Sequence, residues 1–230
     1  MNLDYKEIYA KIKPAMKEIV ETAVFVIVMV IIIRFFIGEI RWIPSGSMKP
    51  TLNEGDRIFV ERFSRFYSTP KRGDVMVFYP PSQDLKYSPV KVFQRLTGFW
   101  CKDIAYIKRV VGMPGDKFEV KKEANGKFGV FINDKKLNEP YIMDEYDYPD
   151  CSNVKYCGPF IIPENKYFMM GDNRGNSQDS RYWGFLDEDR FIGKAVFLFW
   201  PVVRFSEKQV QTPSGNTQSK LLVNWNPKGL

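Results

Sequence analysis

The chain has 230 residues, of which 44% are hydrophobic and 27% charged, a composition that is typical of a globular protein rather than a disordered one. This length permits one sizeable core, or a core with a small appended domain. The formal net charge is +7, but the basic residues are scattered and form no nucleic-acid motif. We therefore expect a membrane surface, and no nucleic acid, as the anionic partner.

The sequence contains no histidine. A Ser-His-Asp or Cys-His catalytic site is therefore excluded within this chain, and so is a zinc site with histidine ligands. The three cysteines are a poor substitute, and we expect neither a metal ion nor a cofactor. If the protein is a hydrolase, its general base must be a carboxylate, a lysine, a tyrosine or the terminal amine.

The first forty residues change from polar to apolar. Residues 1–18 are polar and contain four lysines, which favour a cytoplasmic N-terminus, and residues 24–33 are all apolar. A bilayer is crossed by roughly 20 apolar residues, and charges near the ends of a span can reach the headgroups, so we predict a transmembrane anchor over 19–40. A buried core segment and a cleaved signal peptide are the alternatives. No small-residue cleavage site follows the run, which favours an uncleaved anchor. Three basic residues after the run weaken the orientation assigned from charge: Arg34, Arg41 and Lys49.

Beyond the anchor, short apolar and aromatic runs alternate with turn residues, as is typical of all-β domains. Gly-Asp pairs at 55–56, 73–74 and 115–116 each precede such a run. We predict a mainly β protein with an antiparallel sheet core. The predicted parts are a core built from 41–117 and 166–205, a smaller β-rich domain inserted at 118–165, and a C-terminal tail over 206–230.

Three segments contain side chains suited to chemistry. Residues 43–52 hold two prolines and a Gly-Ser pair, so an irregular loop can present the hydroxyl and the backbone N–H of Ser47 together. Lys108 shares a strand face with apolar neighbours, and loss of solvation would lower its pKa towards the range of a useful base. The third segment, 171–184, is polar and rich in glycine. Taken singly, the three are also compatible with a polar linker, a surface lysine, and an Asx-rich surface loop or cation site.

Together the three segments resemble the signature boxes of one family. Residues 44–52, 106–116 and 171–181 are similar to the boxes of type I signal (leader) peptidases, in the order in which that family carries them. The resemblance implies a membrane-bound endopeptidase that removes signal peptides through an acyl-enzyme. It further implies Ser47 as the nucleophile, Lys108 as the neutral-amine base, and Ser45 as an oxyanion-hole donor. Ser177 would orient the lysine, and Asp179 with Arg181 would form a supporting ion pair.

The resemblance also bears on partners and location. It implies secretory preproteins as substrates, with small residues at the first and third positions before the cut, and we expect Ile43 and Ile107 to line the pockets for them. The spacing of Cys151 and Cys157 is compatible with a disulfide or with two free thiols. The resemblance implies a disulfide, as in some Gram-negative members, and so a domain on the periplasmic face of a bacterial inner membrane.

Five aromatic residues are expected either to rest on the lipid or to pack in the core: Trp42, Phe63, Phe66, Tyr67 and Trp200. Two other functions stay open on the sequence alone. One is serine-lysine chemistry with a different task, such as an autoproteolytic repressor-like enzyme or a penicillin-binding enzyme, although the Ser-x-x-Lys pattern of the latter is absent after Ser45 and Ser47. The other is a non-enzymatic anchored β-domain, which serine-directed acylating inhibitors would not label.

Overall fold

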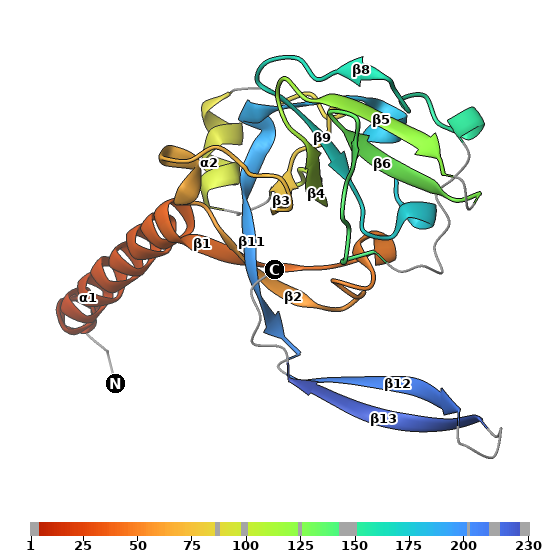
Figure 1. Cartoon of the computed structure of the whole chain (residues 1–230). Coiled ribbons are helices and arrows are strands. Elements are labelled where there is room, and N and C mark those ends of the chain that lie inside the picture. Colours follow the sequence, from red (N-terminus) through yellow and green to blue (C-terminus); the bar gives the residue numbers. More distant parts are fainter. Residues whose placement is uncertain are drawn as a thin grey trace. The chain divides into compact units, whose positions relative to one another are not determined.

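The computed structural model describes residues 5–85, 88–97, 101–123, 126–142, 151–201, 203–211 and 217–225. By internal packing the chain divides into two compact units. The first contains Met1–Ile37 and Lys86–Lys102, and the second contains Gly38–Leu85 and Asp103–Leu230. The prediction of a mainly β fold with an N-terminal apolar helix is confirmed (Figure 1).

The first unit is helical. Its α-helices are α1 (Tyr5–Ile32) and α2 (Pro89–Thr97), and a π-helix over Ile33–Ile37 extends α1. The stretch Ile12–Ile37 is long and apolar enough to cross a membrane, and its side chains are not buried within the protein. The helical run stops where β1 begins at Gly38, which has a φ of +156°; a Cβ there would collide with the carbonyl oxygen of Val60.

A seven-stranded antiparallel sheet forms the centre of the second unit, in the order β1-β2-β11-β3-β4-β9-β10 (Figure 1). Side chains of β4 point to the two faces of the sheet and enter two different apolar cores. Ile107 packs in the core that contains Val75, and Val110 packs in the core that contains Met76 and Tyr167. The strands are β1 (Gly38–Trp42), β2 (Arg57–Glu61), β3 (Val75–Phe78), β4 (Tyr106–Gly112), β9 (Lys166–Met170), β10 (Leu186–Asp187) and β11 (Phe191–Trp200).

A four-stranded antiparallel sheet, in the order β7-β6-β5-β8, lies between β4 and β9 in the sequence. Its strands are β5 (Lys117–Lys122), β6 (Phe128–Ile132), β7 (Lys135–Lys136) and β8 (Phe160–Ile161). Phe118 and Val130 from this sheet share a core with Val111 and Phe168 from the seven-stranded sheet. The insertion is therefore packed onto the two strands that precede and follow it.

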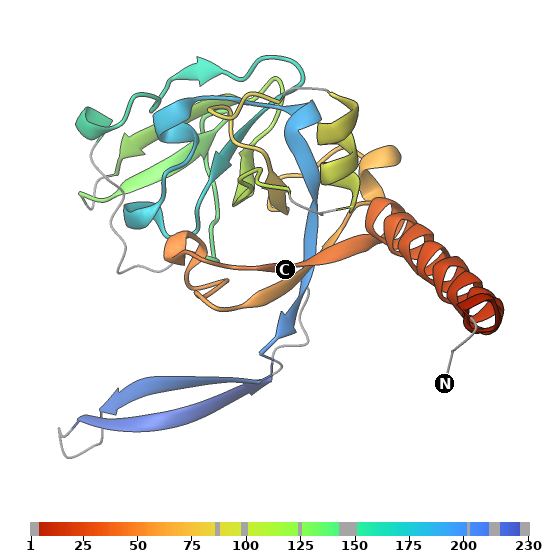
Figure 2. The ribbon, with the colours of Figure 1, turned by 180° about the vertical axis from the view of Figure 1, so that it is seen from behind.

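The C-terminal region, predicted as a tail, contains a separate two-stranded sheet. Strands β12 (Val203–Gln211) and β13 (Thr217–Trp225) pair in antiparallel register along their whole length. Both views show this hairpin as a long ribbon of two strands (Figures 1 and 2). Short helical turns complete the fold, among them Gly46–Met48, Arg174–Asn176 and the one-turn helix α3 (Ser180–Trp183).

Candidate active site

Ser47 lies in the 3₁₀ turn Gly46–Met48, directly after β1 and its following loop. Met48, the last residue of this turn, and Leu52, which follows it, are fully buried, and the amide of Leu52 donates a 2.9 Å hydrogen bond to the carbonyl of Met48. These two apolar anchors fix the turn, because each would lose its burial if the loop shifted. Ser47 is 8% exposed, so little of this residue is in contact with water.

Lys108 meets this serine from β4. Its Nζ lies 2.8 Å from Ser47 Oγ and 2.9 Å from the carbonyl oxygen of Ile107. The Lys108 side chain is 5% exposed, and the ring centroid of Tyr106 lies 5.7 Å from the amine. The two residues are 61 positions apart in the sequence, and the pairing of β3 with β4 places Lys108 opposite Met76 in the middle of the sheet.

The surroundings of Lys108 favour its neutral form. Burial lowers the pKa of Lys108 from 10.5 to about 8; the charges of Asp179 and Asp172 oppose this, and that of Arg181 adds to it. A neutral amine has a lone pair that can accept the proton of the Ser47 hydroxyl. The pair therefore meets one requirement of an activated nucleophile, which is contact with a base. The lowered pKa serves the second requirement, because it makes the unprotonated form of that base accessible near pH 8.

The loop Gly171–Ser177 closes over the serine turn. The backbone amide of Asn173 donates to the carbonyl of Ser47 over 3.0 Å, and its side-chain amide donates to the carbonyl of Gly46 over 3.1 Å. Gly171 lies close to both Ser177 and the serine turn. A Cβ at this position would overlap Ser177 Oγ and come within 2.5 Å of the Ser47 carbonyl oxygen. Glycine is needed at 171 because the loop and the turn are in backbone contact.

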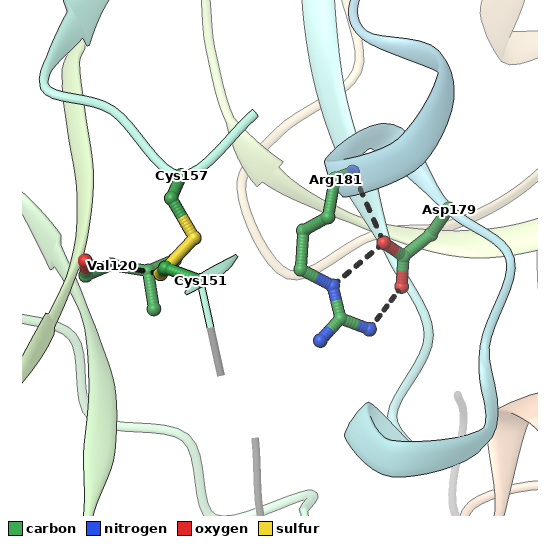
Figure 3. Close-up of a disulfide and its surroundings, with 5 residues drawn as sticks. All are labelled: Val120, Cys151, Cys157, Asp179 and Arg181. Carbon is green, nitrogen blue, oxygen red and sulfur yellow. Dashed lines mark hydrogen bonds and ion pairs between the residues drawn. A yellow bond between two sulfur atoms is a disulfide. The ribbon is translucent and has the colours of Figure 1, made fainter. Parts of the chain in front are cut away.

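Asp179 and Arg181 form a buried bidentate pair at the end of this loop (Figure 3). Arg181 Nε and one terminal nitrogen each donate to a carboxylate oxygen over 2.8 Å, and the amide of Gly171 donates to the same carboxylate over 3.0 Å. Burial raises the pKa of Asp179, but the hydrogen bond and charge of Arg181 outweigh it, so the pKa lies below its usual value. The carboxylate is thus ionised and anchors the amide of Gly171.

A second buried pair involves the strand residue next to Lys108. Arg109, the next residue on β4, donates to both oxygens of Asp172 over 2.8 and 2.6 Å. Thr51, just after the serine turn, donates to the same carboxylate over 2.5 Å. Burial raises the pKa of Asp172, while Arg109 and Thr51 act against that shift. The pair joins the strand of the lysine, the polar loop and the segment that follows the serine.

Glu139, from the segment after β7, adds a third buried pair. It accepts hydrogen bonds from both terminal nitrogens of Arg174 over 2.8 and 2.5 Å, and Arg174 Nε donates to the carbonyl of Gly171 over 2.9 Å. Tyr141, two residues further on, lies under the Arg109 guanidinium at 4.1 Å and donates to Glu139 over 2.9 Å. The inserted region thus contacts the polar loop and the lysine strand at two points.

The other predicted residues lie as follows. Ser45 is exposed and its hydroxyl lies 3.4 Å from that of Ser47. Ser177 Oγ is buried close to the loop backbone and makes no hydrogen bond of ordinary geometry within the part of the chain described. Ile43 and Ile107 are buried in the same apolar core as Met48. Cys151 and Cys157 form a disulfide, drawn beside the Asp179–Arg181 pair in Figure 3.

The sequence reasoning missed Thr51, Glu139 and Tyr141 as parts of this site. Thr51 and its partners Arg109 and Asp172 stand within the quoted motifs. The signal available for Thr51 was its position as a polar residue close to the nucleophile in the sequence. Glu139 offered none, because its partner lies 35 residues further along the chain. Among the described residues, no three His, Cys, Asp or Glu side chains are grouped so that they could hold a metal ion.

A mainly β domain that presents a buried hydroxyl beside a buried amine of lowered pKa has the arrangement of a serine hydrolase with an amine base. The comparisons with known proteins agree with this class. The family model described as "Signal peptidase, peptidase S26" matches residues 16–200. A probable signal peptidase I-2 of Synechocystis sp. is 38% identical over 189 residues, which cover 81% of this chain and 74% of the relative.

Two further relatives are similar over comparable lengths. A signal peptidase I of Leptolyngbya laminosa is 38% identical over 79% of this chain and 78% of its own length. A signal peptidase I of Bacillus licheniformis is 33% identical over 82% of this chain and 91% of its own length. The chain therefore belongs to the signal peptidase family, peptidase S26. The family predicted from the three motifs is confirmed, and with it the class of serine endopeptidase.

Proposed function

We propose that the protein is a membrane-anchored endopeptidase that removes N-terminal signal peptides from exported precursors, with Ser47 as nucleophile and Lys108 as general base. The observation that carries this proposal is the 2.8 Å separation of Ser47 Oγ and Lys108 Nζ in a buried site where the pKa of the lysine is lowered to about 8. Family membership and the apolar helix over Ile12–Ile37 support the substrate class and the membrane anchor.

In this mechanism the neutral amine of Lys108 takes the proton of Ser47 as the oxygen attacks the scissile carbonyl. The peptide carbon becomes tetrahedral and its oxygen becomes an anion, to which the backbone N–H of Ser47 and the hydroxyl of Ser45 would donate hydrogen bonds. The loss of one such donor typically costs about 10²–10³ in rate. The protonated lysine then gives its proton to the leaving amine, and water, activated by the same amine, hydrolyses the acyl-enzyme.

The supporting residues hold this geometry. Asp179 with Arg181 fixes Gly171, and the polar loop in turn fixes the serine turn through Asn173. We propose that Ser177 supports the lysine from this loop, and that Ile43 and Ile107, whose core adjoins the turn, limit the space for the substrate side chains next to the cut. Small residues before the scissile bond are the ones such limited space accepts.

We further propose that the domain acts on the outer face of a bacterial plasma membrane, the periplasmic face where there is one. The disulfide between Cys151 and Cys157 supports this location, since disulfides persist in oxidising compartments. The N-terminal lysines before Ile12 support a cytoplasmic start of the chain.

The test is cleavage of a purified precursor with an Ala-x-Ala site by the full-length protein in detergent or lipid. We expect mass spectrometry to find one cut after the second alanine. Ser47→Ala and Lys108→Met should each abolish it, whereas a matched change of a surface lysine on the inserted sheet, Lys136→Met, should not. Undiminished cleavage by Ser47→Ala would remove Ser47 from the mechanism.

A further inference from the structure

Helix α2 exposes its apolar side chains more than its polar ones. Val90, Val92 and Phe93 are 66%, 40% and 52% exposed, while Lys91, Gln94 and Arg95 are partly buried. At 3.6 residues per turn, the first three occupy one side of the helix and the last three the other. A helix that covers a protein core has the opposite arrangement, with its apolar side inward.

The position of α2 explains this inversion. Within the first compact unit it contacts both α1 and the π-helix Ile33–Ile37, which ends the stretch able to span a membrane. Side chains at that end are themselves apolar and open, with Phe36 and Ile37 47% and 56% exposed. The end of a spanning helix lies at the boundary between acyl chains and headgroups. Because α2 contacts this end of the spanning helix, we expect α2 to lie at the same depth in the bilayer. The apolar side of α2 would then face lipid.

The charge of α2 is of the sign that suits such a boundary. The helix contains Lys91 and Arg95 and no acidic residue. Basic residues on the polar side of an interfacial helix are attracted to anionic headgroups, while apolar residues on the other side enter the upper acyl region. The helix has a defined start, because the hydroxyl of Ser88 accepts a hydrogen bond from the amide of Lys91 over 3.2 Å.

We propose that α2 lies in the plane of the membrane, beside the exit of the spanning helix, with Val90, Val92 and Phe93 in contact with lipid. The hydrolytic site described above does not require this contact. It gives the protein a second attachment to the bilayer, so the enzyme is held by a segment that crosses the membrane and by a segment that lies on it.

The direct test measures the surroundings of each side of the helix. In a Cys101→Ser background, Val90→Cys and, as the matched control on the other side, Lys91→Cys are labelled with an environment-sensitive fluorophore. The full-length protein is placed in vesicles of phosphatidylethanolamine and phosphatidylglycerol. We expect the label at 90 to emit at shorter wavelength than the label at 91, and to be quenched by spin-labelled lipid rather than by aqueous iodide.

Equal quenching of both labels by iodide would overturn the proposal. So would a label at 90 that is shielded in native membranes but not in pure lipid vesicles, because a protein partner would then cover the face. This readout does not depend on catalysis, so it stands or fails separately from the proposed function.

A second test asks whether the contact matters for membrane-resident substrate. Val90→Glu with Phe93→Glu is compared with Gln94→Glu, which adds a carboxylate to the other side of α2. We expect kcat/KM for a precursor inserted in vesicles to fall about tenfold in the first variant only, the loss equivalent to the burial of one aliphatic side chain. Cleavage of a short soluble peptide should be unchanged. Equal losses on both substrates, or none on either, would contradict a lipid contact.

Discussion

We expect Lys108 to lower the free energy of unfolding of the protein at neutral pH. Burial is the main reason why its pKa falls from 10.5 to about 8. The unfolded chain therefore binds this proton more readily than the folded chain, so the free energy of unfolding rises with pH between the two values. Below about pH 8 the whole penalty is present, and it disappears as the pH approaches 10.5. A neutral side chain of similar length would escape the penalty at every pH.

The expected size follows from the same two values. At pH 7 a decrease from 10.5 to about 8 corresponds to a penalty of about 3 kcal/mol, and at pH 10 to less than about 1 kcal/mol. Lys108→Met removes this penalty but leaves Ser47 Oγ without its 2.8 Å partner, which costs about 1 kcal/mol. We therefore expect the variant to be inactive and, at pH 7, more stable than the original protein by about 2 kcal/mol.

The assay is thermal unfolding of the full-length protein in detergent micelles at pH 7 and pH 10. At each pH the melting temperature of the variant is compared with that of the original protein. Arg109→Met is the matched control, because it removes the neighbouring cation of β4 that is paired with Asp172. Breaking that buried pair should destabilise by about 3–5 kcal/mol. The reasoning is refuted if Lys108→Met lowers the melting temperature at pH 7, or if its effect is the same at both pH values.

Two further predictions concern catalysis. With a base of pKa about 8, kcat/KM for a soluble peptide should rise about tenfold per pH unit below that value and level off above it; a flat profile from pH 6 to 9 would contradict Lys108 as the base. Gly171→Ala should lower kcat by about 10²-fold, because the added Cβ would force the polar loop away from the Ser47 carbonyl, and displacements near 1 Å have effects of that size. Unchanged kcat with altered KM alone would show that the loop does not position the serine.

Elements defined by local sequence signals could be predicted, whereas contacts between residues far apart in the sequence could not be predicted from spacing. Strand β4 was predictable because its aromatic and β-branched residues and the Gly-Asp turn after it are local signals. Ser47 and Lys108 were found through motifs, and their separation of 61 residues could not be bridged by spacing alone. The two-residue strands β7 and β10 are too short to carry a pattern at all.

Elements that depend on a partner elsewhere in the chain were not predicted. The hairpin of β12 and β13 lies where a tail was expected, because a strand's pairing depends on a partner that a single polar segment does not reveal. Helix α2 lies in a stretch, 82–101, to which no role could be assigned; its amphipathic pattern indicates a helix, but only its contact with α1 gives that pattern a meaning. The prediction of Ile43 and Ile107 as pocket walls stays a prediction, since both side chains are buried in the core.

We expect the inserted region to contribute to catalysis through Glu139, which lies in the segment after β7. Arg174 is fully buried, and its pairing with Glu139 fixes a segment between Asp172 and Asp179, the two acidic groups whose charges raise the pKa of Lys108. Glu139→Gln would leave that guanidinium without a balancing charge at a cost of about 3 kcal/mol, and the loop can relieve this only by moving the arginine towards water. We expect a lower kcat and faster hydrogen exchange of the amides at 171–177.

The matched control is Glu123→Gln, which breaks a pair with Lys136 on the surface of the same inserted sheet. An exposed pair of this kind contributes about 0–1 kcal/mol, so kcat and loop exchange should stay as they were. If the two substitutions have equally small effects, the insertion is only packed beside the site. If Glu139→Gln alone loosens the loop and lowers kcat, the segment after β7 positions the groups that set the protonation state of the base.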